Sequence, residues 1–239
     1  FTSTGGNIDG EHFDNDDGDP GSIHWDDSGQ PVAFYFSVGT ETDALHSWNA
    51  MDLVHGVLTP SNTVATNVGV GDAVYEGSNR YYIVEVLGNN AFRVQDSGAN
   101  GGTPGNQNIT VLNFPGRIFR AYNSLSAAEA GAGDADHMDS TDLVSSDYQL
   151  HLACYADGAD TSSVLVDGWS TGIDNYIRVF TPYASADAGA SQRHNGTWDG
   201  NAYRLEIDGT TALEFREAYC RVDGLQVKVS TSTTEDRGI

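Results

Sequence analysis

The clearest alternation of apolar and polar positions lies at residues 203–229, YRLEIDGTTALEFREAYCRVDGLQVKV. Three short runs in this segment place an apolar residue at every second position, and Asp-Gly pairs interrupt the pattern. Successive side chains of a β-strand point to opposite faces, so a period of two predicts strands with one buried face. Because Asp-Gly pairs favour tight turns, the segment predicts a stack of short strands.

Further strands are predicted upstream. The nearly continuous apolar run at 32–38 (VAFYFSV) predicts a strand buried on both faces. Between residues 43 and 57 the apolar positions recur every three to four residues, which predicts a short helix. A small antiparallel meander or partly open barrel is predicted from four apolar runs joined by Gly- and Asn-rich turns, at residues 70–75, 81–87, 91–94 and 109–112.

These patterns divide the chain into three parts. Asn-Phe-Pro-Gly at 113–116 breaks the strand pattern and marks a boundary. Beyond it, Ser126 and Glu129 have the spacing of a capping box, which predicts a short helix over 127–131. We therefore predict a mainly β protein: an extended arm (about residues 1–30) and strand region at 1–67, a β-meander or barrel at 68–116, and at 117–239 a β-helix-like or sandwich-like stack with one short helix.

The charge of the chain changes which partners we expect. Eleven Lys and Arg residues stand against 34 Asp and Glu, a formal net charge of −23, and Lys228 is the only lysine. Such a surface repels phosphate backbones and anionic lipid, so neither nucleic-acid binding nor a membrane-surface role is expected. No apolar run approaches the ~18 residues of a membrane-spanning helix. The acidity favours either a generally solvating surface or local cation sites.

Calcium is the cation that the acidic positions suggest. Asp14, Asp16 and Asp19 alternate around Gly18 and resemble a calcium loop, although no Glu follows where an EF-hand requires one, so a solvated acidic turn is the alternative. A second set of carboxylates with nearby arginines would suit a polysaccharide lyase or a glycosidase, or else forms turns and surface pairs; it comprises Asp157, Asp160, Asp167, Asp174, Glu206, Glu214, Glu217, Arg178, Arg193 and Arg204.

Two cysteines and two glycosylation sequons remain. Cys154 and Cys220 lie in strand-like runs and either form one disulfide, which indicates an oxidising compartment, or stay as two buried free thiols. Asn108 and Asn195 each begin an Asn-x-Thr sequon, which matters only in a host that glycosylates exported proteins.

The common catalytic motifs are absent from the sequence. The seven histidines are scattered without zinc-site spacing, and there is no Gly-x-Ser-x-Gly elbow and no phosphate-binding glycine loop. We therefore predict no catalysis. Four tryptophans either stack on sugars or serve as core and interface residues: Trp25, Trp48, Trp169 and Trp198.

The C-terminal half carries a resemblance to a known class of fold. It contains, in order, RIFRAYNSLSAAEAGA, LVSSDYQLHLACYADGADTSSVLVDGW, NYIRVFTP, SQRHNGTWDGNAYRLE and EAYCRVDGLQV, and an apolar residue followed by Asp-Gly recurs at unequal intervals. With these phrases, residues 117–229 resemble the entry region of right-handed parallel β-helix proteins of environmental bacterial and phage-like type. The resemblance implies an elongated β-solenoid and an extracellular, cell-surface or virion-surface setting, but no single activity.

The two ends of the chain add an expectation about assembly. The chain begins with Phe rather than Met and without a leader, as a processed or trimmed chain does. It ends soon after Val229, so a solenoid with ~20 or more residues per rung has few rungs, and its unpaired strand edges are expected to pair with another chain.

We therefore predict a structural subunit of an extracellular filament or virion-surface assembly, held to copies of itself by strand pairing. The loose N-terminal arm supplies the expected assembly residues, Phe1, Ile8, Phe13, Ile23 and Trp25. The alternative is a tail-spike-like β-helix that binds or cleaves polysaccharide. A groove with carboxylates and an aromatic platform would favour the alternative, and a self-complementary strand edge would favour the filament.

Overall fold

The computed structural model describes residues 30–88 and 90–230, and its elements belong to one compact unit, Val32–Ile239. The protein is mainly β, with 44% strand and 7% helix, which confirms the predicted class. The predicted N-terminal arm lies outside the described residues. Within residues 30–88 and 90–230, no helix combines the length and the apolar character needed to cross a membrane.

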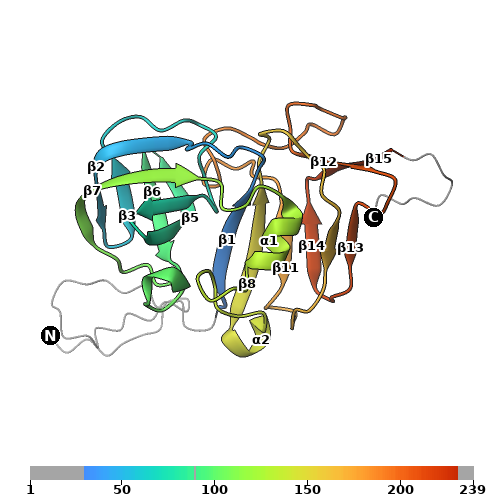
Figure 1. Ribbon diagram of the computed structural model, residues 1–239, viewed down its shortest axis with the longest axis horizontal. Helices are drawn as coiled ribbons and strands as arrows, with labels where there is room; N and C mark the ends of the chain where they lie inside the picture. Colours follow the sequence, from blue (N-terminus) through green and yellow to red (C-terminus); the bar gives the residue numbers. More distant parts are fainter. Residues whose placement is uncertain (1–29, 89, 231–239) are drawn as a thin grey trace, which may run out of the picture. The chain divides into compact units, whose positions relative to one another are not determined.

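Six antiparallel strands close into a barrel in the order β2-β3-β6-β5-β4-β7 (Figure 1). Alternate residues of these strands point inward and fill the barrel with apolar side chains, among them Leu53, Leu58, Ile83, Val94 and Ile118, each 0% exposed. Closure leaves the barrel without a free strand edge. The strands are β2 (His46–Val54), β3 (Val57–Pro60), β4 (Ala73–Glu76), β5 (Asn79–Gly88), β6 (Ala91–Asp96) and β7 (Val111–Phe119).

The predicted helix between residues 43 and 57 is wrong, because this segment forms β2 and its turn into β3. The turn consists of His55 and Gly56, which both have positive φ (48° and 74°), as the tightest hairpin turns require. Gly56 is needed for a second reason, since a Cβ at this position would lie 2.0 Å from the carbonyl oxygen of Gln107. Trp48, Met51 and Leu53 point into the barrel, so their spacing reflects a strand with a register shift.

The predicted boundary at 113–116 is also wrong, because β7 runs through Pro115 and Gly116 without a break. The pairing of β2 with β7 shifts register between Trp48 and Met51, and such a bulge accommodates a proline that donates no hydrogen bond. Gly116 faces the interior, where a Cβ would lie 2.1 Å from Cε of Met51. Glycine here makes room for a core side chain rather than ending the strand.

The remaining strands form three sheets in which every pairing is parallel. The sandwich-like alternative is therefore wrong, because β-sandwiches are built from antiparallel sheets. One sheet has the order β1-β8-β11-β14, the second has the order β15-β12-β9, and β10 pairs with β13. The strands are β1 (Val32–Val38), β8 (Tyr148–Cys154), β9 (Ala159–Asp160), β10 (Val164–Val166), β11 (Ile177–Phe180), β12 (Arg204–Asp208), β13 (Leu213–Phe215), β14 (Cys220–Asp223) and β15 (Gln226–Ser230).

The chain visits the three sheets in rotation. It passes through β8, β9 and β10, then β11, β12 and β13, and then β14 and β15, so each strand lies beside the corresponding strand of the previous round. Aliphatic side chains stack in register as a result, with Leu150 opposite Ile177 and Leu152 opposite Val179. The inward-facing residues of all three sheets share one core, which includes Leu150, Leu152, Val164, Val166, Ile177, Val179, Leu205, Ile207 and Leu213.

The barrel is an insertion between two neighbouring strands of one sheet. β1 pairs with β8 along its whole length, from Val32 opposite Tyr148 to Val38 opposite Cys154, although the barrel separates them in the sequence. Figure 1 shows β1 in blue directly beside β8 in yellow. The predicted strand at 32–38 is confirmed, and it belongs to the same sheet as the C-terminal strands.

The predicted short helix is confirmed as α1 (Leu125–Gly131), but its cap is different. Ser124, not Ser126, is the N-cap, and its hydroxyl accepts a hydrogen bond from the amide of Ala127 at 3.1 Å. Glu129 accepts from the Asp167 amide at 3.2 Å and from Trp169 Nε1 at 3.1 Å instead of reaching back to the cap. A second short helix, α2, spans Leu143–Ser146, and a 3₁₀ turn, η1, spans Gly98–Asn100.

The shared core of the parallel sheets predicts a large stability effect for Leu205→Ala. Leu205 is 0% exposed, so its truncation leaves a cavity and costs about 2–5 kcal/mol of unfolding free energy. Urea denaturation measures the change. Leu112→Ala is the control, because Leu112 is 63% exposed and its loss costs under about 0.5 kcal/mol. Equal effects of the two substitutions would contradict this core.

Candidate functional site

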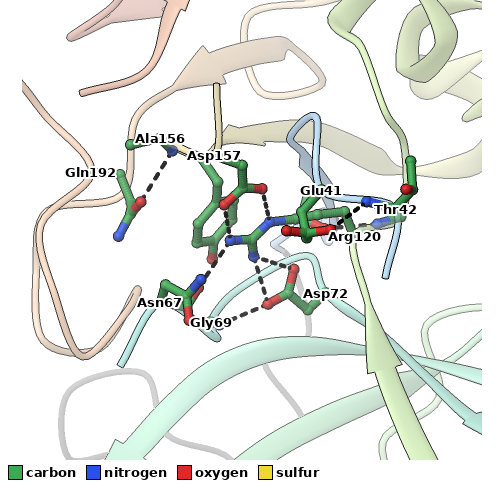
Figure 2. Close-up of polar contacts among 12 residues, drawn as sticks. Glu41, Thr42, Asn67, Gly69, Asp72, Arg120, Ala156, Asp157 and Gln192 are labelled. Carbon is green, nitrogen blue, oxygen red and sulfur yellow. Dashed lines mark hydrogen bonds and ion pairs between the residues drawn. The ribbon is translucent and has the colours of Figure 1, made fainter. Parts of the chain in front are cut away.

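A buried cation joins the barrel to the parallel sheets. Arg120 follows β7, and its side chain is 1% exposed between Asp72 (0%) and Asp157 (8%). Its Nη1 donates to both oxygens of Asp72 at 2.8 and 3.0 Å, while Nε and Nη2 donate to Asp157 at 2.6 and 2.9 Å (Figure 2). The guanidinium also lies 3.7 Å from the ring centre of Tyr155, a close cation–π contact.

The surroundings of Arg120 fix its charge. Burial alone would lower the pKa of the guanidinium, but the charge of Asp72 and the hydrogen bond to Asp157 outweigh it and raise the pKa above its ordinary value. Nη2 donates further to the carbonyl oxygen of Asn67 at 3.2 Å. The contacts thus reach the segment before β4, the end of β7 and the segment after β8, and they are closed to solvent. We interpret this cluster as a structural junction rather than a binding site.

We expect Arg120→Met to destabilise the protein by about 3–5 kcal/mol, because it leaves two buried carboxylates without their cation. The loss should be smaller at pH 4 than at pH 7, since burial raises the pKa of Asp72 and removal of the Arg120 charge raises it further, so that protonation neutralises this carboxylate as the pH falls. Urea titrations at the two pH values test this. The control Arg216→Met removes an exposed arginine that is also paired with two carboxylates and should have little effect. A pH-independent loss would contradict the interpretation.

An open groove of about 800 Å³ lies over β2, β7 and β4 of the barrel. It is formed by exposed residues of these strands, by the buried Trp48 and Gly116 at its floor, and by the segment that follows β3. Its lining is aromatic and polar but contains no carboxylate, and it comprises Ala44, Ser47, Trp48, Asn49, Ser61, Asn62, Tyr75, Gly77, Pro115, Gly116, Arg117 and Phe119.

Strand register places three of these side chains in one row. Arg117 of β7 lies opposite Ser47 of β2 on one side and opposite Tyr75 of β4 on the other. Directly opposed residues share a face of the sheet, with Cβ atoms roughly 5 Å apart. Phe119, two positions along β7, meets the Tyr75 ring edge to face at 5.6 Å between ring centres. The groove therefore combines an aromatic pair with a cation and a hydroxyl.

Arg117 differs from the other basic residues in the described part of the chain. It is exposed, and its side chain makes no hydrogen bond, ion pair or cation–π contact there. The other Lys and Arg side chains within residues 30–88 and 90–230 are all engaged: Arg221 stacks on Tyr176 at 3.4 Å, and carboxylates pair with Arg80, Arg93, Arg120, Arg178, Arg193, Arg204, Arg216 and Lys228.

Further polar groups lie around the groove. Asn49, Asn62, Ser47 and Ser61 present amides and hydroxyls at its edge. His46 lies beside Trp48, with 4.6 Å between the ring centres, and its Nε2 is 3.3 Å from Oδ1 of Asn62. Trp48 is 5% exposed, and its indole Nε1 has no hydrogen-bond partner among the described residues. A buried donor without a partner is costly, so it favours an added acceptor nearby.

The lining of the groove lacks the side chains most often used for acid–base catalysis and metal binding. No carboxylate, cysteine or histidine lines it, so it offers neither a general acid and base pair nor metal ligands. The sequence reading missed Tyr75 and Arg117 because Pro115 and Gly116 were taken as a boundary. The signal was present in β7, where Phe114, Gly116 and Ile118 are buried and alternate with exposed residues.

Of the four aspartates expected to gather on the stack, Asp157, Asp160 and Asp167 are engaged in separate contacts, while Asp174 contributes its backbone carbonyl oxygen to a hydrogen bond from Gln149 Nε2 at 2.8 Å. Asp157 pairs with Arg120, and Asp167 pairs with Arg216 at 3.1 Å. Asp160 is 2% exposed and accepts hydrogen bonds from the Leu125 amide at 2.7 Å and the Tyr203 hydroxyl at 3.2 Å. Among the residues that the structure describes, no three His, Cys, Asp or Glu side chains are grouped as metal ligands.

The glutamates considered for glycosidase chemistry also have separate partners. Glu206 on β12 binds Arg204 at 2.7 Å and Lys228 at 3.3 Å. Glu214 on β13 binds Arg216 at 2.9 Å, while Glu217 accepts from two backbone amides, those of Gly168 and Trp169. Each of these carboxylates is therefore engaged by structural partners of its own.

The two cysteines are free thiols. Cys154 ends β8 and Cys220 begins β14, and β11 lies between these strands. The strand register places Cys220 level with Leu150, so the two Cα atoms are farther apart than the ~7 Å limit of a disulfide. Burial raises the pKa of Cys154, and burial together with Glu217 raises that of Cys220 to about 11, so both thiols stay protonated.

The remaining predicted positions divide into two groups. Asn108 and Asn195 are exposed; Oδ1 of Asn108 lies 3.2 Å from Nδ1 of His55, and Oδ1 of Asn195 accepts from the Thr197 hydroxyl at 2.8 Å. The predicted calcium ligands and assembly residues lie outside the described residues: Asp14, Asp16, Asp19, Phe1, Ile8, Phe13, Ile23 and Trp25.

Comparisons of the chain with protein-family models, with curated proteins and with solved structures gave no match. The resemblance to β-helix proteins therefore stays a prediction, and the function has to be argued from the geometry of the groove and the sheets.

Proposed function

We propose that this chain binds saccharides in the barrel groove and that the three parallel sheets form a short β-helix from which the barrel projects. The rotation of the chain through three sheets supports the β-helix, because each round adds one strand to each sheet in turn. The proposal includes an extracellular setting, where polysaccharide is the partner that the groove meets.

The observation that carries saccharide binding is the aromatic and amide lining of the groove. The rings of Tyr75 and Phe119 line the groove, and although the Arg80 guanidinium lies 5.2 Å from the centre of the Tyr75 ring, the pair still offers apolar surface that suits the C–H face of a pyranose. Asn49 and Asn62 offer amide donors and acceptors beside them, which match the hydroxyls on the rim of the sugar. A few polar groups around an apolar platform are typical of a ligand site.

Binding to a panel of soluble polysaccharides by affinity electrophoresis tests this proposal. We expect Tyr75→Leu to weaken binding about tenfold, because it removes the aromatic face but keeps an apolar side chain. Trp198→Leu is the matched control, since Trp198 is 49% exposed and does not line the groove. Loss of binding in the Trp198 variant alone would place the site elsewhere and overturn the proposal.

Assembly by strand pairing is a second candidate, which the edge of the four-stranded sheet favours. In the described part of the chain, β14 pairs only with β11, and β15 pairs only with β12, so each leaves one edge unpaired. At β14, Tyr219 and Val222 are 52% and 44% exposed. Unpaired edges are templates for another strand, and a head-to-tail contact of this kind builds a filament of identical subunits.

Negative-stain microscopy and light scattering over a range of concentrations test the assembly. We expect rods or concentration-dependent oligomers, and we expect Val222→Lys to suppress them by placing a charge on the pairing edge. The control is Val54→Lys, since Val54 is 40% exposed on the barrel, away from this edge. A protein that stays monomeric at high concentration, or equal effects of both substitutions, would contradict assembly through β14.

A further inference from the structure

Arg117, the exposed cation of the groove, is available to bind an anionic group. Arg117 carries a positive charge in a chain of net charge −23, and in the described residues its side chain makes no hydrogen bond, ion pair or cation–π contact. Its neighbours across the strands are Ser47 and Tyr75, which are both uncharged, and its neighbours at alternate positions of β7 are Pro115 and Phe119. None of these four neighbours carries a negative charge.

We propose that Arg117 binds the carboxylate of a uronic acid, so that the groove selects an acidic saccharide. This inference rests on the proposed saccharide binding. A guanidinium presents two parallel N–H donors that match the two oxygens of a carboxylate. The adjacent Tyr75 lies one strand spacing away, roughly 5 Å, which is comparable to the size of a sugar ring. A uronate whose ring lies on the Tyr75 and Phe119 side chains thus directs its carboxylate toward Arg117.

The net negative charge of the protein limits the charge density of the saccharides that the groove can bind. Arg117 is the one basic residue among those that line the groove, and the negative field of the protein repels a densely charged chain. A sulfated polysaccharide or a continuous polyuronate would bring many charges to a site that neutralises one. The groove therefore fits a mostly neutral polysaccharide in which uronic acid residues are separated by neutral sugars.

Three matched ligands test this selection by calorimetric titration of the full chain. The first is a neutral oligosaccharide with a single uronate, the second is the same compound with its carboxyl reduced to a hydroxymethyl group, and the third is a continuous polyuronate of the same length. We expect the single-uronate ligand to bind about tenfold tighter than its reduced form at low salt, and the ratio to fall at high salt because the screened charge contributes less.

Two substitutions assign the selectivity to Arg117. Arg117→Gln should bring the ratio of the two affinities to about one, and Arg117→Lys should give an intermediate ratio because it keeps the charge without the paired donors. Arg216→Gln makes the same change in net charge at an exposed arginine outside the groove and should leave the ratio unaltered. Thermal melts of all variants check that the fold is retained.

The outcomes separate this inference from the proposed function. Equal affinity of the unaltered protein for the single-uronate ligand and its reduced form would overturn the acidic selectivity while leaving saccharide binding intact. Binding of none of the three ligands would overturn the proposed function itself. Tighter binding of the continuous polyuronate would overturn the limit on charge density, and an altered ratio in the Arg216 variant would assign the preference to net charge instead of Arg117.

Discussion

The guanidinium of Arg120 is the contact on which the arrangement of this protein depends. Through Asp72 and Asp157 it joins a segment of the barrel to the segment that follows β8, and it does so without access to solvent. Two buried carboxylates without a cation would be strongly unfavourable. Arg120 neutralises both of them, one in the barrel and one in the segment that follows β8. Arg120 is only three residues from Arg117, so the same strand end that fixes the barrel also presents the groove.

Arg120 and Arg117 have different roles because the first is buried and the second is exposed. Arg120 is enclosed, paired twice and stacked on Tyr155, so no ligand reaches it. Arg117 points outward from β7 on the exposed side of the barrel and has no partner in the described residues. A closed barrel holds most of the groove residues, Arg117 and Tyr75 among them, on its strands, which favours a preformed site that loses little entropy when a ligand binds.

Local sequence patterns predicted most of the strands, but they did not predict which strands pair across a long separation in the sequence. The alternation at 203–229 and the apolar run of β1 reflect burial of one or both faces, which a sequence shows directly. The pairing of β1 with β8 across the barrel has no local signal, so β1 was grouped with the N-terminal region. Pro115 and Gly116 resemble a turn in isolation, and only the bulge in β2 and the side chain of Met51 explain their place in β7. This misreading concealed the groove.

The insertion of the barrel between β1 and β8 has a consequence for biosynthesis. During translation β1 emerges first, but its partner strand appears only after the whole barrel has been made. The barrel closes by pairing β2 with β7 and is complete within residues 46–119, whereas the β1 to β8 contact spans the whole barrel segment and forms more slowly. A nascent chain therefore carries an apolar, unpaired β1 beside a finished barrel, and this interval is when the protein is most exposed to misassembly and most in need of a chaperone.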